Sequence, residues 1–254
     1  MREFIMLAGK DSVGKTCSLV SLAWYLEQTQ PGVTCHTIET ENKFKAALRS
    51  FGTDAPNNIS YYKCDNMNMV TDALESILRV AELGDWVFVE SMDRVWEKAQ
   101  DLGYQAIAGT DKVSYLEKRR AAKGQKMPVT PQPDQLWGII KGAHDSAFLD
   151  LLSQSDSLNV ALTTTLAKPP KTDSFMKENQ DRKAVRVELG MDAGIQGAPR
   201  LPYYPETLCL LELKGGQVSC RVLRDNLSVN EDSRVEFPVP SRKEWASQFW
   251  STCR

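Results

Sequence analysis

Apolar residues occur along the first half of the chain as short continuous runs, separated by stretches with helical spacing. Continuous apolar runs are typical of strands that are buried on both faces, as in parallel sheets. We expect such strands at Phe4–Ala8, Val33–Ile38, Ile59–Cys64, Trp86–Val89 and Leu158–Thr164. Helices are expected between them at Lys15–Gln28, Phe44–Phe51 and Val70–Leu83. Because strands and helices alternate, the pattern predicts an α/β fold with a mainly parallel sheet flanked by helices.

The second half of the chain departs from this alternation. Two apolar runs, Leu208–Leu213 and Val218–Leu223, flank a pair of glycines and predict an antiparallel hairpin at the end of the sheet. Polar, proline-containing insertions at about 101–134 and 168–205 predict long loops, which are usually either functional or disordered. With no internal repeat and no second apolar core, residues 1–254 are expected to form a single domain.

The composition narrows the class of protein. Of the 254 residues, 42% are hydrophobic and 25% are charged, which are the proportions of an ordinary globular protein. The net charge of -2 argues against a basic coat for nucleic acid and leaves only a local basic patch. The six cysteines include no CxxC pair, and there are only two histidines, so a zinc site is not expected. Without a signal peptide or a long apolar run, the sequence predicts a cytoplasmic protein with no membrane partner.

The first candidate chemistry follows the first strand, where Gly9–Thr16 reads GKDSVGKT. This stretch fits the pattern G-x-x-x-x-G-K-[ST] between a strand and a helix, and we call it the phosphate loop. Glycines let backbone N–H groups surround phosphate oxygens, and the helix N-terminus adds a partial positive charge. Lys15 would contact the β- and γ-phosphates of ATP, and the Thr16 hydroxyl would bind Mg²⁺. The predicted nucleotide-binding residues are Gly9, Lys10, Asp11, Ser12, Val13, Gly14, Lys15, Thr16 and Cys17.

The stretch after the second strand, IETENKF from Ile38 to Phe44, resembles the RecA/RadA recombinase family. In that family the second core strand ends in a pattern like I-D-T-E, and a Phe follows two residues later. The resemblance implies that Glu41 is the catalytic carboxylate that activates the water attacking the γ-phosphate, and that Lys15 assists catalysis at the phosphates. Glu39 departs from the family pattern, which has Asp at this position.

A second match lies in WVFVESMDRVW, Trp86–Trp96, which resembles the Walker B strand of the same family. Four apolar residues lead to Glu90, where the family has the Asp that holds the Mg²⁺ shell. A glutamate is longer and still reaches a metal-bound water, so Glu90 is our candidate for a water-mediated Mg²⁺ contact and a catalytic role. Two alternatives stay open: Asp93 serves instead, or the site binds ATP and turns it over slowly.

Further along, the resemblance implies two groups that respond to the nucleotide. The strand Leu158–Thr165 matches the family strand that carries a polar γ-phosphate sensor, and Thr164 is our candidate among the threonines 163–165. Threonines also simply suit the ends of strands. Arg221 or Arg224 would reach the nucleotide of a neighbouring subunit as an arginine finger, which implies a homo-oligomer in the form of a ring or filament. Single arginines at strand ends are otherwise ordinary surface charges.

The layout as a whole resembles the compact RecA-like ATPases of bacteriophages, of the recombination and single-strand-annealing kind. A helix or helix pair, expected at Gln135–Leu152, suits that group. The resemblance implies that single-stranded DNA binds at the two insertions, where basic residues neutralise phosphates and aromatic residues stack on bases. The candidates are Lys118, Arg119, Arg120, Arg182 and Lys183. The plainer interpretation is that these are solvated loops whose charges keep the protein in solution.

Together these features predict an Mg²⁺-dependent ATPase that acts in DNA recombination, repair or replication, in the host cytoplasm if a phage encodes it. Two alternatives stay open. Partition ATPases of the ParA type also have a lysine directly after the first glycine of the phosphate loop, where this chain has Lys10. They carry Gly-Gly in place of Asp11-Ser12. A P-loop small-molecule kinase would need a lid over its acceptor, and the basic segment Lys112–Lys126 resembles one.

Overall fold

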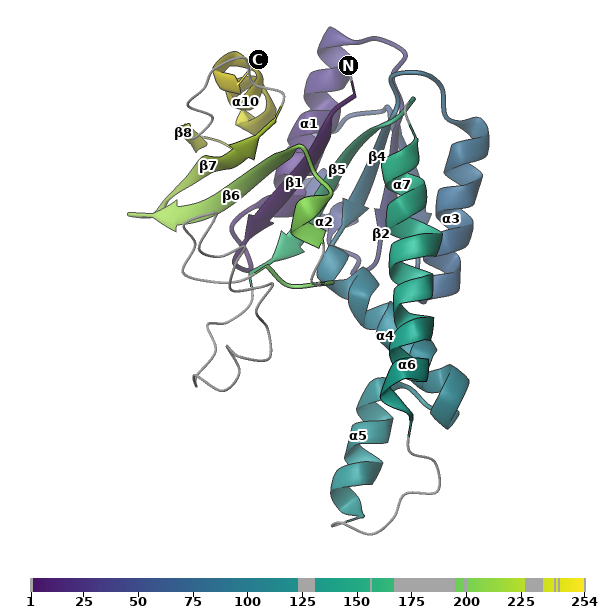
Figure 1. Ribbon diagram of the computed structural model, residues 1–254. Helices are drawn as coiled ribbons and strands as arrows, with labels where there is room; N and C mark the ends of the chain where they lie inside the picture. The colour runs from purple at the N-terminus through teal and green to yellow at the C-terminus, as the bar shows by residue number, and fades with distance from the viewer. Residues whose placement is uncertain are drawn as a thin grey trace.

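The structure is a computed structural model, and it describes residues 2–122, 131–155, 157–166, 195–198, 201–226, 235–239, 241 and 243–253. In this part of the chain an eight-stranded sheet has the order β3-β2-β4-β5-β1-β6-β7-β8 (Figure 1). The strands are β1 (Phe4–Gly9), β2 (Cys35–Glu39), β3 (Ile59–Lys63), β4 (Trp86–Glu90), β5 (Asn159–Thr165), β6 (Thr207–Lys214), β7 (Gln217–Asp225) and β8 (Glu236–Val239). The strands from β3 to β6 in this order are parallel, and β7 and β8 are antiparallel to their neighbours. This confirms the predicted α/β fold, with its mainly parallel sheet and C-terminal antiparallel hairpin.

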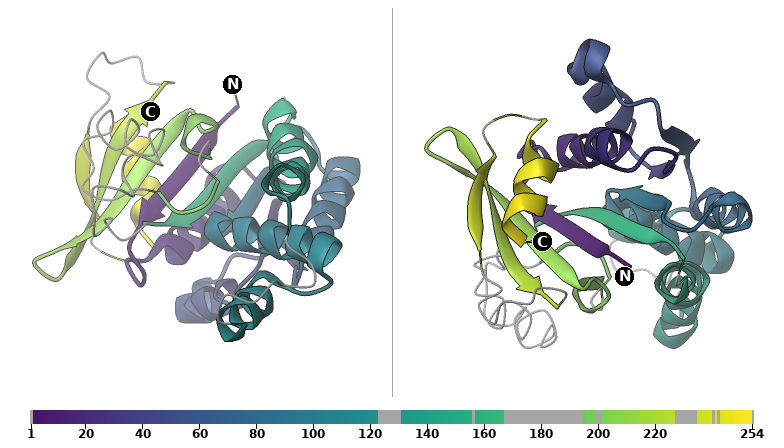
Figure 2. Two further views of the ribbon diagram at one scale, coloured as in Figure 1. Left: turned by 60° about the horizontal axis from the view of Figure 1, so that its bottom comes forward. Right: turned by 90° about the horizontal axis from the view of Figure 1, so that it is seen from above.

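Helices cover both faces of the sheet (Figure 2). One face is covered by α1 (Lys15–Thr29), α2 (Phe44–Phe51) and α10 (Trp245–Cys253). The other face is covered by α3 (Met67–Val80), α4 (Met92–Ala108) and a continuous helical segment made of α6 (Pro133–Lys141), the π-helical η2 (Gly142–Leu149) and α7 (Asp150–Gln154). Short 3₁₀ turns lie at η1 (Gly52–Asp54) and η3 (Leu201–Tyr203).

The side chains of β1 show why its apolar run is continuous. Phe4 and Met6 pack with the helices of the α3 and α4 face, whereas Ile5 and Leu7 pack with those of the α1 face. All residues of β1 are buried, as expected for a strand near the middle of a sheet covered on both sides. Each large apolar side chain buried in this way stabilises the fold by about 1.5–3 kcal/mol.

The helices differ from the predicted segments mainly at their ends. α2 has the predicted bounds, whereas α3 begins at Met67 rather than at the predicted Val70. The earlier start is due to Asn66, whose side chain accepts a hydrogen bond from the backbone N–H of Met69 at 3.0 Å and caps the helix. The apolar repeat marks the buried face of a helix, not its cap, and therefore places such ends poorly.

The prediction of a long loop over 101–134 is wrong for most of the stretch that the structure describes. α4 runs through its beginning and ends at Gly109, which has the left-handed φ of 65°. α5 (Lys112–Ala121) follows at once, with the Asp111 side chain as its N-cap. Within α5 only Tyr115 is buried, so the sequence carries almost no apolar repeat from which to recognise the helix.

The helical segment predicted at Gln135–Leu152 is confirmed, since α6, η2 and α7 follow one another without a break. Most of the second insertion, 168–205, lies outside the described residues, which there comprise 195–198 and 201–205. Among the helices that the structure describes, none is both long enough and apolar enough to cross a bilayer.

Candidate functional site

A cavity of about 500 Å³ lies at the carboxyl ends of β1, β4 and β5, beside the start of α1. Parallel α/β sheets bind their ligands at this edge, because the loops after the strands meet there. Backbone and side chains from several elements line it: Asp11, Ser12, Val13, Gly14, Lys15, Thr16, Cys17, Lys43, Ala46, Ala47, Ser50, Glu90, Ser91, Thr165 and Val218. The phosphate loop therefore forms one wall, and the residues after β2 and β4 form the opposite wall.

The two glycines of the phosphate loop are required for different reasons. Gly14 has a φ of 96° at the start of α1, a conformation that residues with a side chain rarely adopt. A Cβ on Gly9 would lie 2.8 Å from the backbone oxygen of Leu211 and 2.7 Å from Val13 Cγ2, closer than real Cβ contacts allow. The loop thus turns tightly out of β1, against β6, and leads directly into α1.

Lys15 lies over this loop. Its Nζ donates hydrogen bonds to the backbone oxygens of Gly9 at 2.9 Å and Lys10 at 2.8 Å. Burial lowers the pKa of the Lys15 ammonium below its ordinary value of 10.5, although nearby Asp11 opposes the shift. An ammonium has three N–H donors, so the loop carbonyls hold Lys15 at the cavity and leave one donor for an anion.

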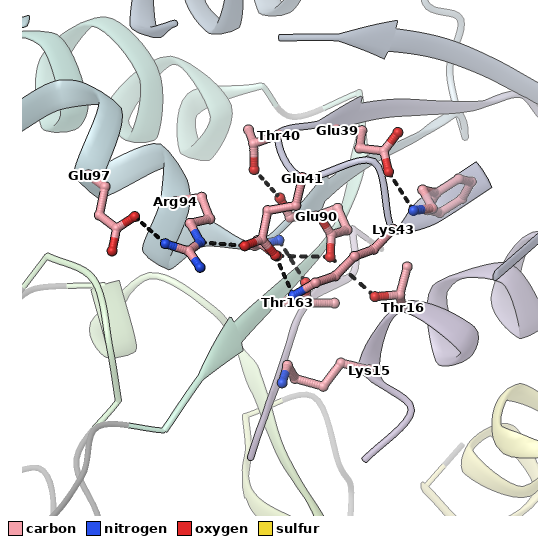
Figure 3. A network of polar contacts seen from close by, with 12 residues as sticks. Lys15, Thr16, Glu39, Thr40, Glu41, Lys43, Glu90, Arg94, Glu97 and Thr163 are labelled. Carbon is pink, nitrogen blue, oxygen red and sulfur yellow. Dashed lines mark hydrogen bonds and ion pairs between the residues drawn. The ribbon is translucent and has the colours of Figure 1, made fainter. Parts of the chain in front are cut away.

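Glu90 meets the phosphate loop at the end of β4 (Figure 3). Its Oε1 accepts hydrogen bonds from Ser91 Oγ at 2.8 Å and from Thr16 Oγ1 at 3.2 Å. The residue is only 1% exposed, and its Oε2 is buried with no hydrogen-bond partner among the described residues. Burial raises the pKa of Glu90 to about 7. A buried carboxylate oxygen without a donor, next to a threonine hydroxyl, offers the hard oxygen ligands that Mg²⁺ prefers, directly or through water.

Glu41 lies between Arg94 and Glu90 (Figure 3). Its carboxylate accepts a hydrogen bond from Ser91 Oγ at 2.9 Å, forms an ion pair with Lys43 Nζ at 2.6 Å and binds Arg94 Nε. Burial raises the pKa of Glu41, but the hydrogen bonds from Lys43, Arg94 and Ser91 outweigh it and lower the pKa below its ordinary 4.5. Ser91 Oγ lies within hydrogen-bond distance of both Glu41 and Glu90 and links them, donating its single proton to one of them at a time. Glu41 is ionised near neutral pH.

Glu39 has a different environment. It is fully buried on β2, where its Oε1 accepts a hydrogen bond from the backbone N–H of Phe44 at 2.5 Å, in the first turn of α2. Figure 3 shows its side chain turned away from Glu41. Burial raises the pKa of Glu39. Glu39 therefore fixes the entry into α2, and it does not line the cavity.

Asp93, the alternative to Glu90, lies in the first turn of α4. It is 8% exposed and does not line the cavity, whereas Glu90 does and also contacts Thr16. Burial raises the pKa of Asp93. The contacts therefore favour Glu90 over Asp93 as the carboxylate that serves the phosphate loop.

The threonines at the end of β5 face opposite sides of the sheet. Thr163 Oγ1 accepts a hydrogen bond from the backbone N–H of Ser91 at 2.8 Å, and Thr165 lines the cavity. Thr164, our sensor candidate, donates to the backbone oxygen of Gln196 at 2.8 Å on the other face. Of the three threonines, Thr165 is the one placed to meet a ligand in the cavity.

The two arginine-finger candidates are engaged in contacts along β7. Arg224 donates to the backbone oxygens of Pro202 and Pro205, both at 2.6 Å. Arg221 lies 3.6 Å from Glu212 on the neighbouring strand. Neither arginine lines the cavity of its own chain.

Three of the DNA-binding candidates, Lys118, Arg119 and Arg120, are exposed in the last turn of α5. Figure 1 shows α5 projecting from the body of the protein below α4 and α6. It is held there by the rings of Tyr104 and Tyr115, whose centroids are 5.2 Å apart. Arg182 and Lys183 lie outside the described residues.

Sequence reasoning missed Lys43 and Arg94, which both contact Glu41. Lys43 stands two residues after Glu41 within the stretch that resembles RecA/RadA, and Arg94 follows the Walker B-like strand. The signal available in the sequence was that each of these basic residues lies within four positions of a candidate catalytic glutamate, Glu41 or Glu90. The pairing of Arg94 with Glu41 depends on β2 and β4 being neighbours, which the sequence does not state, whereas Lys43 is close to Glu41 in the chain itself.

Comparison with known proteins does not assign this chain to a family. No protein-family model matches the sequence, and no curated protein matches it significantly. Its function therefore has to be inferred from the cavity and from the residues that line it.

From the raised pKa of Glu90 we predict how the free energy of unfolding changes with pH. Native Glu90 keeps its proton up to about pH 7, whereas an unfolded glutamate loses it near pH 4.5. Wild-type stability therefore falls as the pH rises between these values, and the loss persists above pH 7. Glu90→Gln does not ionise, so it should gain stability relative to the wild type over this range, by on the order of 3 kcal/mol.

Urea denaturation without Mg²⁺ or nucleotide, at pH values from 5 to 8, measures this difference. Glu75→Gln, which alters an exposed carboxylate on α3, is the matched control and should show no such gain. A constant difference between Glu90→Gln and the wild type at every pH would contradict the assignment of a protonated buried Glu90.

Proposed function

We propose that this protein binds ATP with Mg²⁺ in the cavity and hydrolyses it. The observation that carries the proposal is the contact between Thr16 and Glu90 at the mouth of the phosphate loop, with a second carboxylate, Glu41, joined to it through Ser91. A chance glycine-rich turn before a helix has no reason to face two carboxyl groups at this distance. A Mg²⁺-triphosphate site needs both, one beside the metal and one beside the attacking water.

The size of the neighbouring space supports a nucleotide. A second cavity of about 230 Å³ shares Val13, Gly14, Cys17 and Val218 with the first and extends to Val239. Phosphates at the phosphate loop would leave the ribose and base in this second cavity, where valine side chains offer an apolar contact for a base. Binding sites for small molecules are usually apolar with a few convergent polar groups, as here.

The residues suggest the following mechanism. Backbone N–H groups of the phosphate loop and Lys15 would bind the β- and γ-phosphates. Thr16 and Glu90 would hold Mg²⁺, which would supply positive charge to the phosphate oxygens. Glu41 orients a water against the γ-phosphorus. The water oxygen forms a bond to phosphorus, the bond to the ADP oxygen breaks, and the products are ADP, phosphate and a proton. Because its pKa is low, Glu41 acts mainly by orienting the water and stabilising positive charge on it.

The resemblance to RecA-like ATPases supports a role in DNA recombination, repair or replication, and the exposed basic turn of α5 supports single-stranded DNA as a partner. A small-molecule kinase is less well supported, because no residue of α5, the lid expected for one, is among the described residues that line the cavity. A partition ATPase is also less well supported, since Lys10 is exposed and lies outside the cavity lining.

Replacing Lys15 tests nucleotide binding. Lys15→Ala removes an ammonium from the phosphates, and charged hydrogen bonds of this kind contribute about 1.5–3 kcal/mol, so ATP affinity should fall about 10- to 100-fold. Isothermal titration with Mg²⁺-ATP measures it. Lys10→Ala is the matched control and should keep its affinity within about twofold, because its side chain is exposed. Equal affinity of wild type and Lys15→Ala would refute a phosphate site at this loop.

Replacing Glu41 tests hydrolysis. Glu41→Gln keeps the shape of the side chain and its contact with Ser91 but loses the charge that orients the water, so turnover should fall about 10²- to 10⁴-fold. ATP affinity should change little. Glu97→Gln removes the other carboxylate bound to Arg94, outside the cavity, and should retain turnover. If Glu41→Gln released phosphate at the wild-type rate, a group other than Glu41 would have to orient the attacking water.

The DNA proposal is tested by removing the basic turn of α5. In a triple variant, Lys118→Ala, Arg119→Ala and Arg120→Ala, affinity for a single-stranded oligonucleotide should fall, and the salt dependence of log affinity should become shallower by about 2, since each lost phosphate contact contributes about 0.7. Fluorescence anisotropy over a salt series measures both. A control triple variant changes other exposed cations to Ala: Lys45, Arg49 and Lys63. The same slope in both triple variants would show that α5 does not contact DNA.

A further inference from the structure

Lys43 is a second cation of the cavity, opposite Lys15. It directly precedes α2, and its side chain lines the cavity that the phosphate loop bounds on the other side. Its Nζ lies 2.6 Å from Glu41 Oε2, and its side chain is 54% exposed. Lysine carries a compact charge on a long flexible stem, so this ammonium reaches different partners at little energetic cost.

The charge of Lys43 interacts with the charged groups of the phosphate loop. Burial lowers the pKa of Lys43, but its contact with Glu41 outweighs this and raises the pKa above the ordinary 10.5, with Glu90 and Asp11 adding to the shift. The charge of Lys43 in turn lowers the pKa of Lys15. Two ammonium groups that repel each other across a cavity are stabilised together by an anion placed between them.

Glu41 does not depend on Lys43 alone. Ser91 Oγ and Arg94 also donate to its carboxylate, and Arg94 is held in turn by Glu97 at 2.6 Å. Neither Ser91 nor Arg94 needs to move if Lys43 leaves. Lys43 is therefore the donor that Glu41 gives up most easily. Its departure frees one acceptor position on Glu41 Oε2 for a water, while Ser91 Oγ stays at the other.

We propose that Lys43 binds the γ-phosphate of the nucleotide and that it leaves Glu41 when it does so. The inference rests on the proposed function and adds to it a residue that recognises a triphosphate. With a diphosphate in the cavity, Lys43 stays on Glu41. With a triphosphate, one movement of one side chain adds positive charge to the reacting phosphoryl group and frees an acceptor position on Glu41 Oε2 for the attacking water.

This role also places a catalytic cation within the same chain. The resemblance to RecA-like ATPases implies a finger from a neighbouring subunit, but Arg221 and Arg224 are engaged with Glu212 and with two backbone oxygens. A positive charge that stabilises the transferred phosphoryl group acts equally well from the same chain or from another. Turnover per subunit is then independent of protein concentration.

The test compares the affinities of wild type and Lys43 variants for a non-hydrolysable ATP analogue and for ADP, each with Mg²⁺, by isothermal titration. Lys43→Ala should weaken the analogue about 10-fold or more, the value of a charged hydrogen bond, and should leave ADP within about twofold. Lys43→Arg should keep most of the preference for the triphosphate. Lys45→Ala, on the exposed side of α2, is the matched control and should behave as wild type.

A merely structural role of Lys43 would weaken both nucleotides alike, and that result, or an unchanged ratio, overturns the inference. Lys43→Gln keeps a polar side chain but removes the charge, and its thermal unfolding shows whether α2 has been disturbed. If wild type binds neither nucleotide, the proposed function itself fails. If wild type binds both nucleotides and the ratio of the two affinities in Lys43→Gln and Lys43→Ala equals that of the wild type, only the role of Lys43 fails. Single-turnover rates that rise with protein concentration would place the catalytic cation in another subunit.

Discussion

The site depends on how the buried carboxyl group of Glu90 is stabilised, by hydrogen bonds and by either a proton or a metal ion. A buried charge is unfavourable unless it is paired or bound to a metal. The Thr16 hydroxyl donates to one of its oxygens, and the Ser91 hydroxyl shares its single proton between that oxygen and Glu41. The other oxygen of Glu90 has no partner among the described residues. The carboxyl therefore holds its proton up to about pH 7, and a divalent cation at that oxygen would displace the proton. The same contacts hold the start of α1 to the end of β4.

The order of the strands sets the distances in this arrangement. β5 lies between β1 and β4, so the ends of β1 and β4 are about 10 Å apart, twice the usual spacing of neighbouring strands. The phosphate loop crosses this gap, and Thr16 reaches Glu90 from the first turn of α1. β5 contributes Thr163, which accepts the backbone N–H of Ser91 and thus fixes the residue that links the two carboxylates. The cavity lies at the end of β5, between the phosphate loop and the residues that follow β4.

Much of this could be predicted from the sequence, because the relevant signals are local. The phosphate loop is defined by residues within eight positions, and the apolar runs of β1 and β4 are continuous because both faces of these strands are buried. The position of Glu90 follows from the end of such a run. The protonation states do not follow, because they depend on burial and on donors from other elements. Glu39 and Glu41 stand two residues apart, yet one caps α2 and the other pairs with Lys43 and Arg94.

The features that could not be predicted from the sequence are a mostly polar helix and a contact between residues far apart in the chain. The sequence predicts a loop in place of α5, because Tyr115 is the only buried residue of this helix and leaves almost no apolar repeat. Arg94 belongs to α4, and it meets Glu41 only because β2 and β4 are adjacent in the sheet. Pairings of this kind depend on the order of strands, which local patterns do not encode.

The central claim is that Thr16 and Glu90 bind a divalent cation together with a nucleotide. The most direct measurement is a crystal structure of the protein with Mn²⁺ and a non-hydrolysable ATP analogue, with anomalous scattering recorded for the metal. The account predicts a metal peak about 2.1 Å from Thr16 Oγ1 and joined to Glu90 directly or through one water, with the β- and γ-phosphates in the phosphate loop. A metal peak elsewhere, or a phosphate loop that stays empty at saturating analogue, would contradict it.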